Sequence, residues 1–170
     1  TYYLALGSNL GDRLGYLARA IRAMARLGDI ESISGVYETA PWGYLDQGPF
    51  LNMAVALESE LEPDALLARL EEIQRFFGKV VTVKNGPRTL DIDILLAENE
   101  VIHTPLLDIP HPRLAERRFV LEPLSEIAPL AIHPVLNVTI ENLLGRLPSD
   151  PSAMRVATPD QILEEVELLK

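Results

Sequence analysis

The order of its patterned segments is the feature of this sequence that most constrains the fold. Apolar residues that alternate with polar ones are typical of a half-buried strand, whereas apolar residues three and four apart indicate one face of a helix. Six such segments precede residue 100. We expect strands over residues 2–6, 30–39, 50–58 and 89–97, with one helix after the first strand and another after the third.

Local signals mark the ends of both helices. Asp12 is a suitable N-cap for the first and Gly28 ends it, whereas Pro63 opens the second and Gly78 stops it. The order strand, helix, strand, strand, helix, strand predicts an α+β fold with a ferredoxin-like core, an antiparallel sheet that carries two helices on one face. The remainder predicts additional C-terminal helices, which we expect over residues 121–129, over 139–147 and in a tail that includes 160–170.

Length and composition limit the class of protein. The 170 residues, nearly half of them apolar, predict one globular domain over residues 1–170. Without cysteine there is no disulfide framework and no thiolate metal site. The net charge of -10 argues against a nucleic-acid binder. No apolar run is long enough to span a membrane and no signal peptide is evident, so we expect a soluble cytoplasmic protein without membrane partners.

The strand expected over residues 89–97 carries two carboxylates. Leu90, Ile92, Ile94 and Leu96 alternate with Asp91 and Asp93. Residues i and i+2 of a strand share a face, so the two carboxylates lie close together and repel unless a cation lies beside them. Mg²⁺ binds through one or two carboxylates together with substrate phosphates, and Arg88 is placed to hold such a phosphate. The alternative is a pair of exposed acids on a solvent-facing sheet.

A second candidate site lies where a Pro- and Gly-rich loop, residues 39–49, enters the strand at residue 50. Phe50 and Asn52 are again an i, i+2 pair, and an aromatic ring beside an amide suits a flat heterocycle. Phe119 is a candidate for the opposite side of such a ring, and His111, between two prolines, for a phosphate contact. Each also has a plain interpretation: core packing for the two phenylalanines and an ordinary loop histidine for His111.

Four motifs, in order and spacing, resemble those of the 6-hydroxymethyl-7,8-dihydropterin pyrophosphokinases of folate biosynthesis. They are "LGSNLGDR", "TAPWGYLDQGPFLN", "GPRTLDIDILL" and "IPHPRLAERRFVLEPLSEIAP". The resemblance runs from about Tyr3 to Pro129, and the last 25 or so residues carry no recognisable part of it. It implies transfer of pyrophosphate from ATP to the hydroxymethyl group of the pterin, which yields the pterin diphosphate and AMP.

The resemblance also assigns roles to individual residues. It implies that Asp91 and Asp93 bind two Mg²⁺ ions, with Arg88 as a third catalytic residue, and that Phe50 and Phe119 enclose the pterin ring. The remaining pterin contacts are Asn52 and the backbone of Thr39, Ala40 and Trp42; the nucleotide contacts are Lys79, Lys84, Arg88, His111 and Arg117. Glu71 and Gln74 lie where the family has polar residues near the pterin loop, and we leave them out of the site.

One segment departs from the family pattern. Many members carry two arginines before the Gly-Pro-Arg motif, often with Trp beside its Gly, whereas this chain has Lys79, Val81 and Asn85 there. Lys84 gives a point charge rather than a bidentate fork. A binding module that keeps both pockets but has lost efficient transfer is therefore an alternative function. A palm-like polymerase or nuclease domain is another use of an Asp pair, which the acidic charge opposes.

Overall fold

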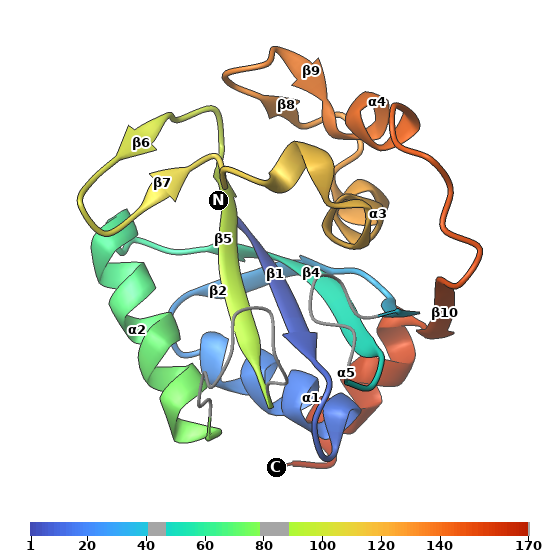
Figure 1. The fold of residues 1–170 in the computed structure, drawn as a ribbon. Coiled ribbons are helices and arrows are strands. Elements are labelled where there is room, and N and C mark those ends of the chain that lie inside the picture. The colour runs from blue at the N-terminus through green and yellow to red at the C-terminus, as the bar shows by residue number, and fades with distance from the viewer. Residues whose placement is uncertain (41–46, 79–88, 170) are drawn as a thin grey trace.

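The computed structural model describes residues 1–40, 47–78 and 89–169 of the chain. Its main sheet contains β1 (Tyr2–Ser8), β2 (Asp29–Ile33), β3 (Val36–Thr39), β4 (Phe50–Glu58), β5 (Asp91–Ala97) and β10 (Met154–Ala157). The helices are α1 (Arg13–Met24), α2 (Pro63–Phe76), α3 (Arg118–Ile127), α4 (Ile140–Gly145) and α5 (Pro159–Glu167), with a 3₁₀ turn, η1 (Leu114–Glu116), before α3. Figure 1 shows this mixed α and β arrangement.

The main sheet is antiparallel, and β1 is an inner strand between β4 and β5. The strand order is β10-β3-β4-β1-β5, and β2 pairs with the part of β4 that extends beyond β3. β1 therefore pairs with β4 on one side and with β5 on the other. The segments that the alternating pattern predicted as strands all take part in this sheet.

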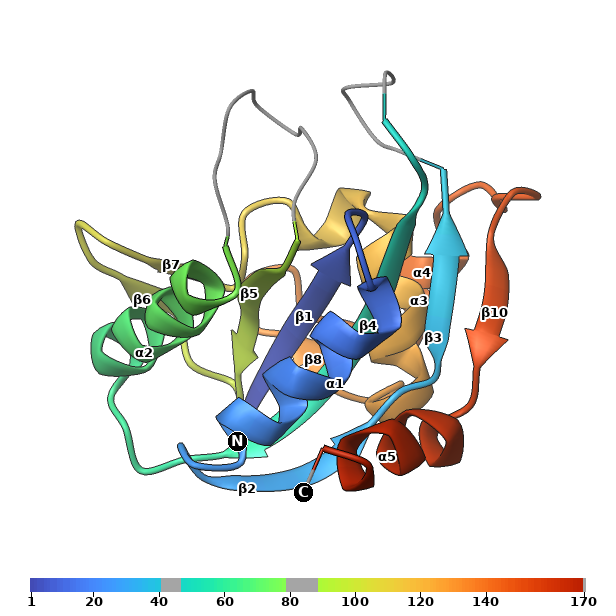
Figure 2. The ribbon, with the colours of Figure 1, turned by 90° about the horizontal axis from the view of Figure 1, so that it is seen from below.

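Two core clusters lie on opposite faces of the sheet. Alternate residues of β1, β4 and β5 pack with α1 and α2 on one face, as Leu6 and Ile92 do. The other face packs with α3 and α4, and Leu121 and Leu124 of α3 are fully buried there. Figure 2 shows α1 and α2 in front of the sheet and α3 behind it. The two predicted helices thus lie on one face, but α5 packs there as well through the buried Ile162, and α3 covers the second face.

Both predicted helix starts are confirmed, but the end predicted for α1 is wrong. Asp12 Oδ1 accepts the Gly15 N–H at 3.2 Å, and Pro63 is the first residue of α2. α1 ends at Met24, four residues before Gly28. A Cβ at Gly28 would lie 2.0 Å from the Glu58 carbonyl oxygen. That glycine is therefore needed because two backbone segments approach closely, not because a helix ends there.

The single strand expected over residues 30–39 is two strands. The break falls at Ser34 and Gly35, between β2 and β3. Ser34 Oγ accepts the Ala54 N–H at 2.8 Å and donates to the Gly35 carbonyl oxygen at 2.7 Å. A side chain thus replaces part of the backbone ladder, which lets the chain bend while its buried polar groups stay paired.

The strict alternation predicted for residues 90–96 is broken near its end. Leu4 and Tyr3 of β1 pair with Ile94 and Leu96, so Leu95 is an extra residue in β5. Leu96 consequently packs in the cluster around α3, whereas Ile92 and Ile94 pack in the cluster around α1 and α2. The prediction that Leu96 shares their face is wrong because a bulge reverses the side-chain direction. Asp91 and Asp93 precede the bulge and keep their common face.

The C-terminal part has the expected helices and three unpredicted β features. α3, α4 and α5 correspond to the helices expected there, although α3 begins at Arg118 rather than at residue 121. The unpredicted features are β10 and two hairpins, one formed by β6 (Ile102–His103) and β7 (Asp108–Ile109), the other by β8 (Ile132–His133) and β9 (Val138–Thr139). Within the described ranges, no helix is long and apolar enough to cross a lipid bilayer.

Candidate active site

A cleft opens on the α3 face of the sheet because β1 carries small residues there. Gly7 of β1 pairs with Asn52 on one side and with Asp91 on the other, and Ala5 pairs with Asp93. The cleft spans about 610 Å³, a volume that includes open solvent at its mouth. Its lining comprises Ala5, Leu6, Gly7, Thr39, Ala40, Phe50, Asn52, Asp91, Asp93, Arg117, Phe119 and Val120. The structure therefore brings most of the predicted site residues into one cavity.

One side of the cleft presents an oriented amide and two aromatic rings. Asn52 is buried, and its Nδ2 donates to Thr39 Oγ1 at 2.8 Å. Its Oδ1 points toward Gly7, where an added Cβ would lie 3.5 Å away. Phe50 and Phe119 line the same cavity, and each is only half-buried. Neither is a fully buried core residue, and part of each is exposed.

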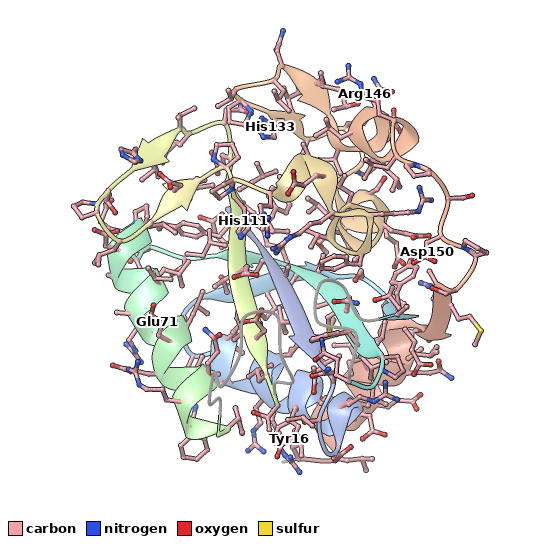
Figure 3. The ribbon with its side chains drawn as sticks, in the orientation of Figure 1. Tyr16, Glu71, His111, His133, Arg146 and Asp150 are labelled. Atoms are coloured by element: carbon pink, nitrogen blue, oxygen red, sulfur yellow. The ribbon has the colours of Figure 1, made fainter. Side chains whose placement is uncertain are left out.

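The other side presents the two carboxylates on a firmly held strand. Asp91 and Asp93 are both half-buried at the cleft. Between them, the Ile92 N–H donates to Gln74 Oε1 at 3.2 Å, and Gln74 Nε2 donates to the Leu70 carbonyl oxygen. Gln74 is buried, so α2 fixes the backbone that carries the carboxylates. Gln74 thus belongs beneath the site, whereas Glu71 is exposed on α2 (Figure 3).

Arg117 supplies positive charge at the same cleft. It is the N-cap residue of α3, and its guanidinium carbon lies 5.8 Å from the centre of the Phe119 ring. Burial lowers the pKa of Arg117, and the nearby Asp93 and Asp91 oppose that shift. An arginine stays charged under these conditions. Arg117 therefore links the aromatic side of the cleft with the side that carries the two carboxylates.

His111 lies next to β5 but is not among the residues that line the cleft. Its N–H donates to the Leu95 carbonyl oxygen at 2.9 Å, and its Nδ1 accepts the Arg113 N–H at 3.1 Å. Burial and the charge of Arg117 lower the pKa of His111, and Asp91 opposes them. A neutral ring that accepts at Nδ1 carries its proton on Nε2, so His111 can donate one hydrogen bond. Figure 3 shows its place among the central elements of the molecule.

Four predicted site residues lie outside the described part of the chain. They are Trp42, expected at the pterin, and Lys79, Lys84 and Arg88, expected at the nucleotide. The substitutions noted at Val81 and Asn85 lie there as well.

Two residues of the first motif hold the segment that leads into β4, a role that the sequence reasoning missed. Asn9 Nδ2 donates to Gln47 Oε1 at 2.8 Å and to the Gly48 carbonyl oxygen at 3.2 Å. Arg13 Nη1 donates to the Pro49 carbonyl oxygen at 3.1 Å. The signal was present in the "LGSNLGDR" motif, in which Asn9 and Arg13 had no assigned role, but their partners lie about 40 residues away along the chain.

Comparison with known proteins places the chain in a family. Residues 3–129 match the family described as 7,8-dihydro-6-hydroxymethylpterin-pyrophosphokinase (HPPK). A 2-amino-4-hydroxy-6-hydroxymethyldihydropteridine pyrophosphokinase of Aquifex aeolicus is 46% identical over 79% of this chain and 84% of the relative. The protein of the same name from Bacillus subtilis is 47% identical over 74% of this chain and 76% of the relative.

Longer proteins contain a similar segment. The folic acid synthesis protein FOL1 of Dictyostelium discoideum is 40% identical over 92% of this chain, which spans only 24% of that protein. The solved wild-type Plasmodium falciparum HPPK-DHPS with SDX-DHP has a TM-score of 0.72 at 17% identity, over 91% of this chain and 47% of that chain. At that identity the structural match shows a shared fold. On the evidence of the family match and of the two bacterial relatives, the chain belongs to the 7,8-dihydro-6-hydroxymethylpterin-pyrophosphokinase family.

Proposed function

We propose that this cleft binds 6-hydroxymethyl-7,8-dihydropterin beside the phosphates of ATP and transfers pyrophosphate between them. The family carries out this ATP-dependent reaction in folate biosynthesis. The hydroxymethyl oxygen forms a bond to the β-phosphorus of ATP while the bond from that phosphorus to the α,β-bridging oxygen breaks. AMP leaves with that oxygen, and the hydroxyl proton is released. The products are the pterin diphosphate and AMP.

The pterin side of the proposal rests on the amide and the two rings. Asn52 Oδ1 accepts from the pterin N–H groups because its Nδ2 is engaged by Thr39. Phe50 and Phe119 stack on the two faces of the ring, and the backbone at Thr39, Ala40 and Trp42 completes the recognition of its edge. Stacking together with edge recognition by hydrogen bonds is how flat heterocycles are commonly bound.

The metal side rests on the donor set. Asp91 and Asp93 share one face, and within the described ranges no third His, Cys, Asp or Glu joins them in a group that could hold a metal. Such a pair fits Mg²⁺, which takes one or two carboxylates and completes its shell with phosphate oxygens and water. We propose two Mg²⁺ ions here. Bound there, they neutralise phosphate charge and lower the pKa of the attacking hydroxyl.

The remaining roles fall to positive and hydrogen-bonding groups. Arg117 faces the transferred phosphates from the α3 side, and His111 donates through Nε2 to the nucleotide. Arg88, Lys79 and Lys84 contribute further nucleotide contacts. Phosphoryl transfer depends mainly on positioning and charge stabilisation, so we assign neither aspartate as a general base.

A single observation carries the proposal: Asn52 and Asp91 flank Gly7 in one row of the sheet. In that row, the amide that would bind the heterocycle and a carboxylate that would bind the metal face the same cavity from either side of β1. The strand order β3-β4-β1-β5 with two helices on one face supports a ferredoxin-like core, and we treat residues 1–170 as one catalytic domain. Its ligands are then small molecules, without nucleic acid or membrane partners.

The test is an assay with ATP, Mg²⁺ and 6-hydroxymethyl-7,8-dihydropterin, in which the nucleotides are separated. AMP formed in step with a pterin diphosphate, and lost without Mg²⁺, is the expected result. ADP would contradict pyrophosphoryl transfer. Binding of the pterin without any nucleotide product would favour the binding module, to which the replacements at Val81 and Asn85 point.

A further inference from the structure

Glu126 connects α3, which carries Phe119, to β3, which carries Thr39. It lies on α3, seven residues after Phe119. Its carboxylate accepts hydrogen bonds from Tyr37 of β3 and from Gly35, the residue just before β3. Tyr37 OH donates to Oε1 at 2.6 Å, and the Gly35 N–H donates to Oε2 at 2.8 Å. The third donor is Arg155 of β10, whose Nη2 lies 3.0 Å from Oε2.

On both α3 and β3, the residues that make these contacts share a face with residues that line the cleft. Residues seven apart lie on the same face of a helix, so Phe119 and Glu126 project from one stripe of α3, about 10 Å apart along its axis. On β3, Tyr37 and Thr39 are an i, i+2 pair, and Tyr37 pairs directly with Asn52. The carboxylate therefore joins the helix that carries one pterin-stacking ring to the strand that supports the pterin-reading amide.

The local sequence is fitted to this junction. A Cβ at Gly35 would lie 2.5 Å from Arg155 Nε and 2.7 Å from the Ala157 carbonyl oxygen. Gly35 is thus required for β10 to approach, and Arg155 then lies opposite Tyr37 in the β10–β3 pairing. Burial would raise the pKa of Glu126, but the hydrogen bonds from Tyr37, Gly35 and Arg155 outweigh it and keep that pKa below its ordinary value. Burial and this hydrogen bond raise the pKa of Tyr37 to about 12, so its hydroxyl remains a donor.

We propose that Glu126, with Tyr37 and Arg155, is a positioning group that sets the width of the pterin cleft by tying α3 to β3. This inference rests on the proposed function, because it assigns Phe119 and Asn52 to the pterin. It also gives a role to β10, which lies beyond the part of the chain that matches the family. None of the three residues lines the cleft, so they act through Phe119, Thr39 and Asn52.

The decisive comparison is Glu126→Gln against Glu122→Gln. Both residues lie on α3, but Glu122, one turn before Glu126, pairs with Arg118 of the same helix at 3.6 Å. The carboxylate of Glu126 accepts three hydrogen bonds. In Glu126→Gln one carboxylate oxygen is replaced by an NH₂ group, which cannot accept from these donors. We expect the dissociation constant of the pterin to rise about tenfold in Glu126→Gln, with that of a non-hydrolysable ATP analogue unchanged within about twofold. Glu122→Gln should leave both constants unchanged.

Four further variants separate positioning from general stability. Tyr37→Phe and Arg155→Ala each remove one contact and should weaken pterin binding less than Glu126→Gln does, whereas Arg155→Lys should restore part of the loss in Arg155→Ala. The double variant Tyr37→Phe/Glu126→Gln should be no worse than Glu126→Gln alone, because the two changes break the same hydrogen bond. Additive losses, or equal losses for pterin and the ATP analogue in a folded Glu126→Gln protein, would overturn the inference.

Amide hydrogen exchange tests the same idea without any ligand. Faster exchange is expected in Glu126→Gln for residues 118–122 and 36–39, with residues 63–76 of α2 unchanged. Unchanged exchange at α3 and β3 would overturn the proposal that Glu126 ties these two elements together, even if the pterin binds. If the wild-type protein binds no pterin, the proposed function fails. The exchange result alone then decides whether Glu126 holds α3 and β3 together.

Discussion

Asn52 and Asp91 lie in one row of the sheet, on either side of Gly7. Each is one strand away from β1, so their backbones are roughly 10 Å apart across the sheet. Because Gly7 has no side chain, no side chain of β1 lies in this row between the amide and the carboxylate. This row is the structural basis for a site in which a heterocycle and a metal-bound phosphate meet.

Asp93→Asn tests the metal role of the carboxylates. Loss of one negative charge from the pair weakens metal binding, and we expect turnover measured as AMP formation to fall by orders of magnitude. Thermal stability should be nearly unchanged, because the substitution also relieves repulsion between Asp91 and Asp93. Asp29→Asn, at an exposed position at the start of β2, is the matched control. A purified Asp93→Asn protein with wild-type turnover would remove this residue from the metal site.

Phe119→Ala tests the aromatic wall of the cleft. Stacking on a heterocycle contributes about 1–3 kcal/mol, so calorimetry should show pterin affinity reduced about tenfold to a hundredfold and ATP affinity nearly unchanged. Phe76→Ala is the control, since Phe76 is 83% exposed on α2. Equal losses of affinity for both ligands would mean that Phe119 acts as a core residue instead.

Gln74→Met tests the support beneath the carboxylates. The substitution keeps the side-chain length but leaves the Ile92 N–H without its acceptor in a buried place, which should lower the free energy of unfolding by about 1–3 kcal/mol. Denaturant unfolding measures this change. Glu71→Met, at an exposed position on the same helix, should change the free energy by less than about 0.5 kcal/mol. Similar effects of the two substitutions would contradict the proposed anchor.

His133→Asn tests a pH-dependent contribution to stability. His133 is buried, its Nδ1 accepts from the Val135 and Leu136 N–H groups, and burial lowers its pKa from 6.5. The unfolded chain therefore binds the proton more readily, and the stability from neutral His133 is lost as pH falls below 6.5.

The wild-type free energy of unfolding should thus decline between about pH 7 and pH 5, and less steeply in His133→Asn. Asn keeps an oxygen acceptor for the same N–H groups but does not titrate. An unchanged slope in His133→Asn would show that this ring does not titrate with folding.

Local periodicity was sufficient to predict the strands and helices that build the sheet and one of its helical faces. It also placed Asp91 with Asp93 and Phe50 with Asn52, because the i, i+2 rule needs no knowledge of the neighbouring strand. The bulge at Leu95 escaped it, since a bulge is defined by the partner strand. Local periodicity also failed to predict β10, because its four residues form a strand only by pairing with β3.

The other side of the site depended on pairing between distant segments. Sequence spacing could not show that Gly7 would face both Asn52 and Asp91, or that Glu126 would meet Tyr37 and Arg155. Those relationships arise from strand order and register, which are fixed by burial on both faces of the sheet. Family resemblance supplied the ligand chemistry, and the structure supplied the arrangement of the residues around the cleft.

The most direct test of the shared site is the effect of bound Mn²⁺ on the proton relaxation of bound 6-hydroxymethylpterin, in the presence of a non-hydrolysable ATP analogue. Mn²⁺ can replace Mg²⁺ at oxygen-ligand sites and is paramagnetic. We predict strong broadening of the hydroxymethyl protons in the wild-type protein, none with Mg²⁺, and loss of the broadening in Asp93→Asn. Bound pterin whose protons relax normally at saturating Mn²⁺ and nucleotide would contradict a single cleft that joins Asn52 to Asp91 and Asp93.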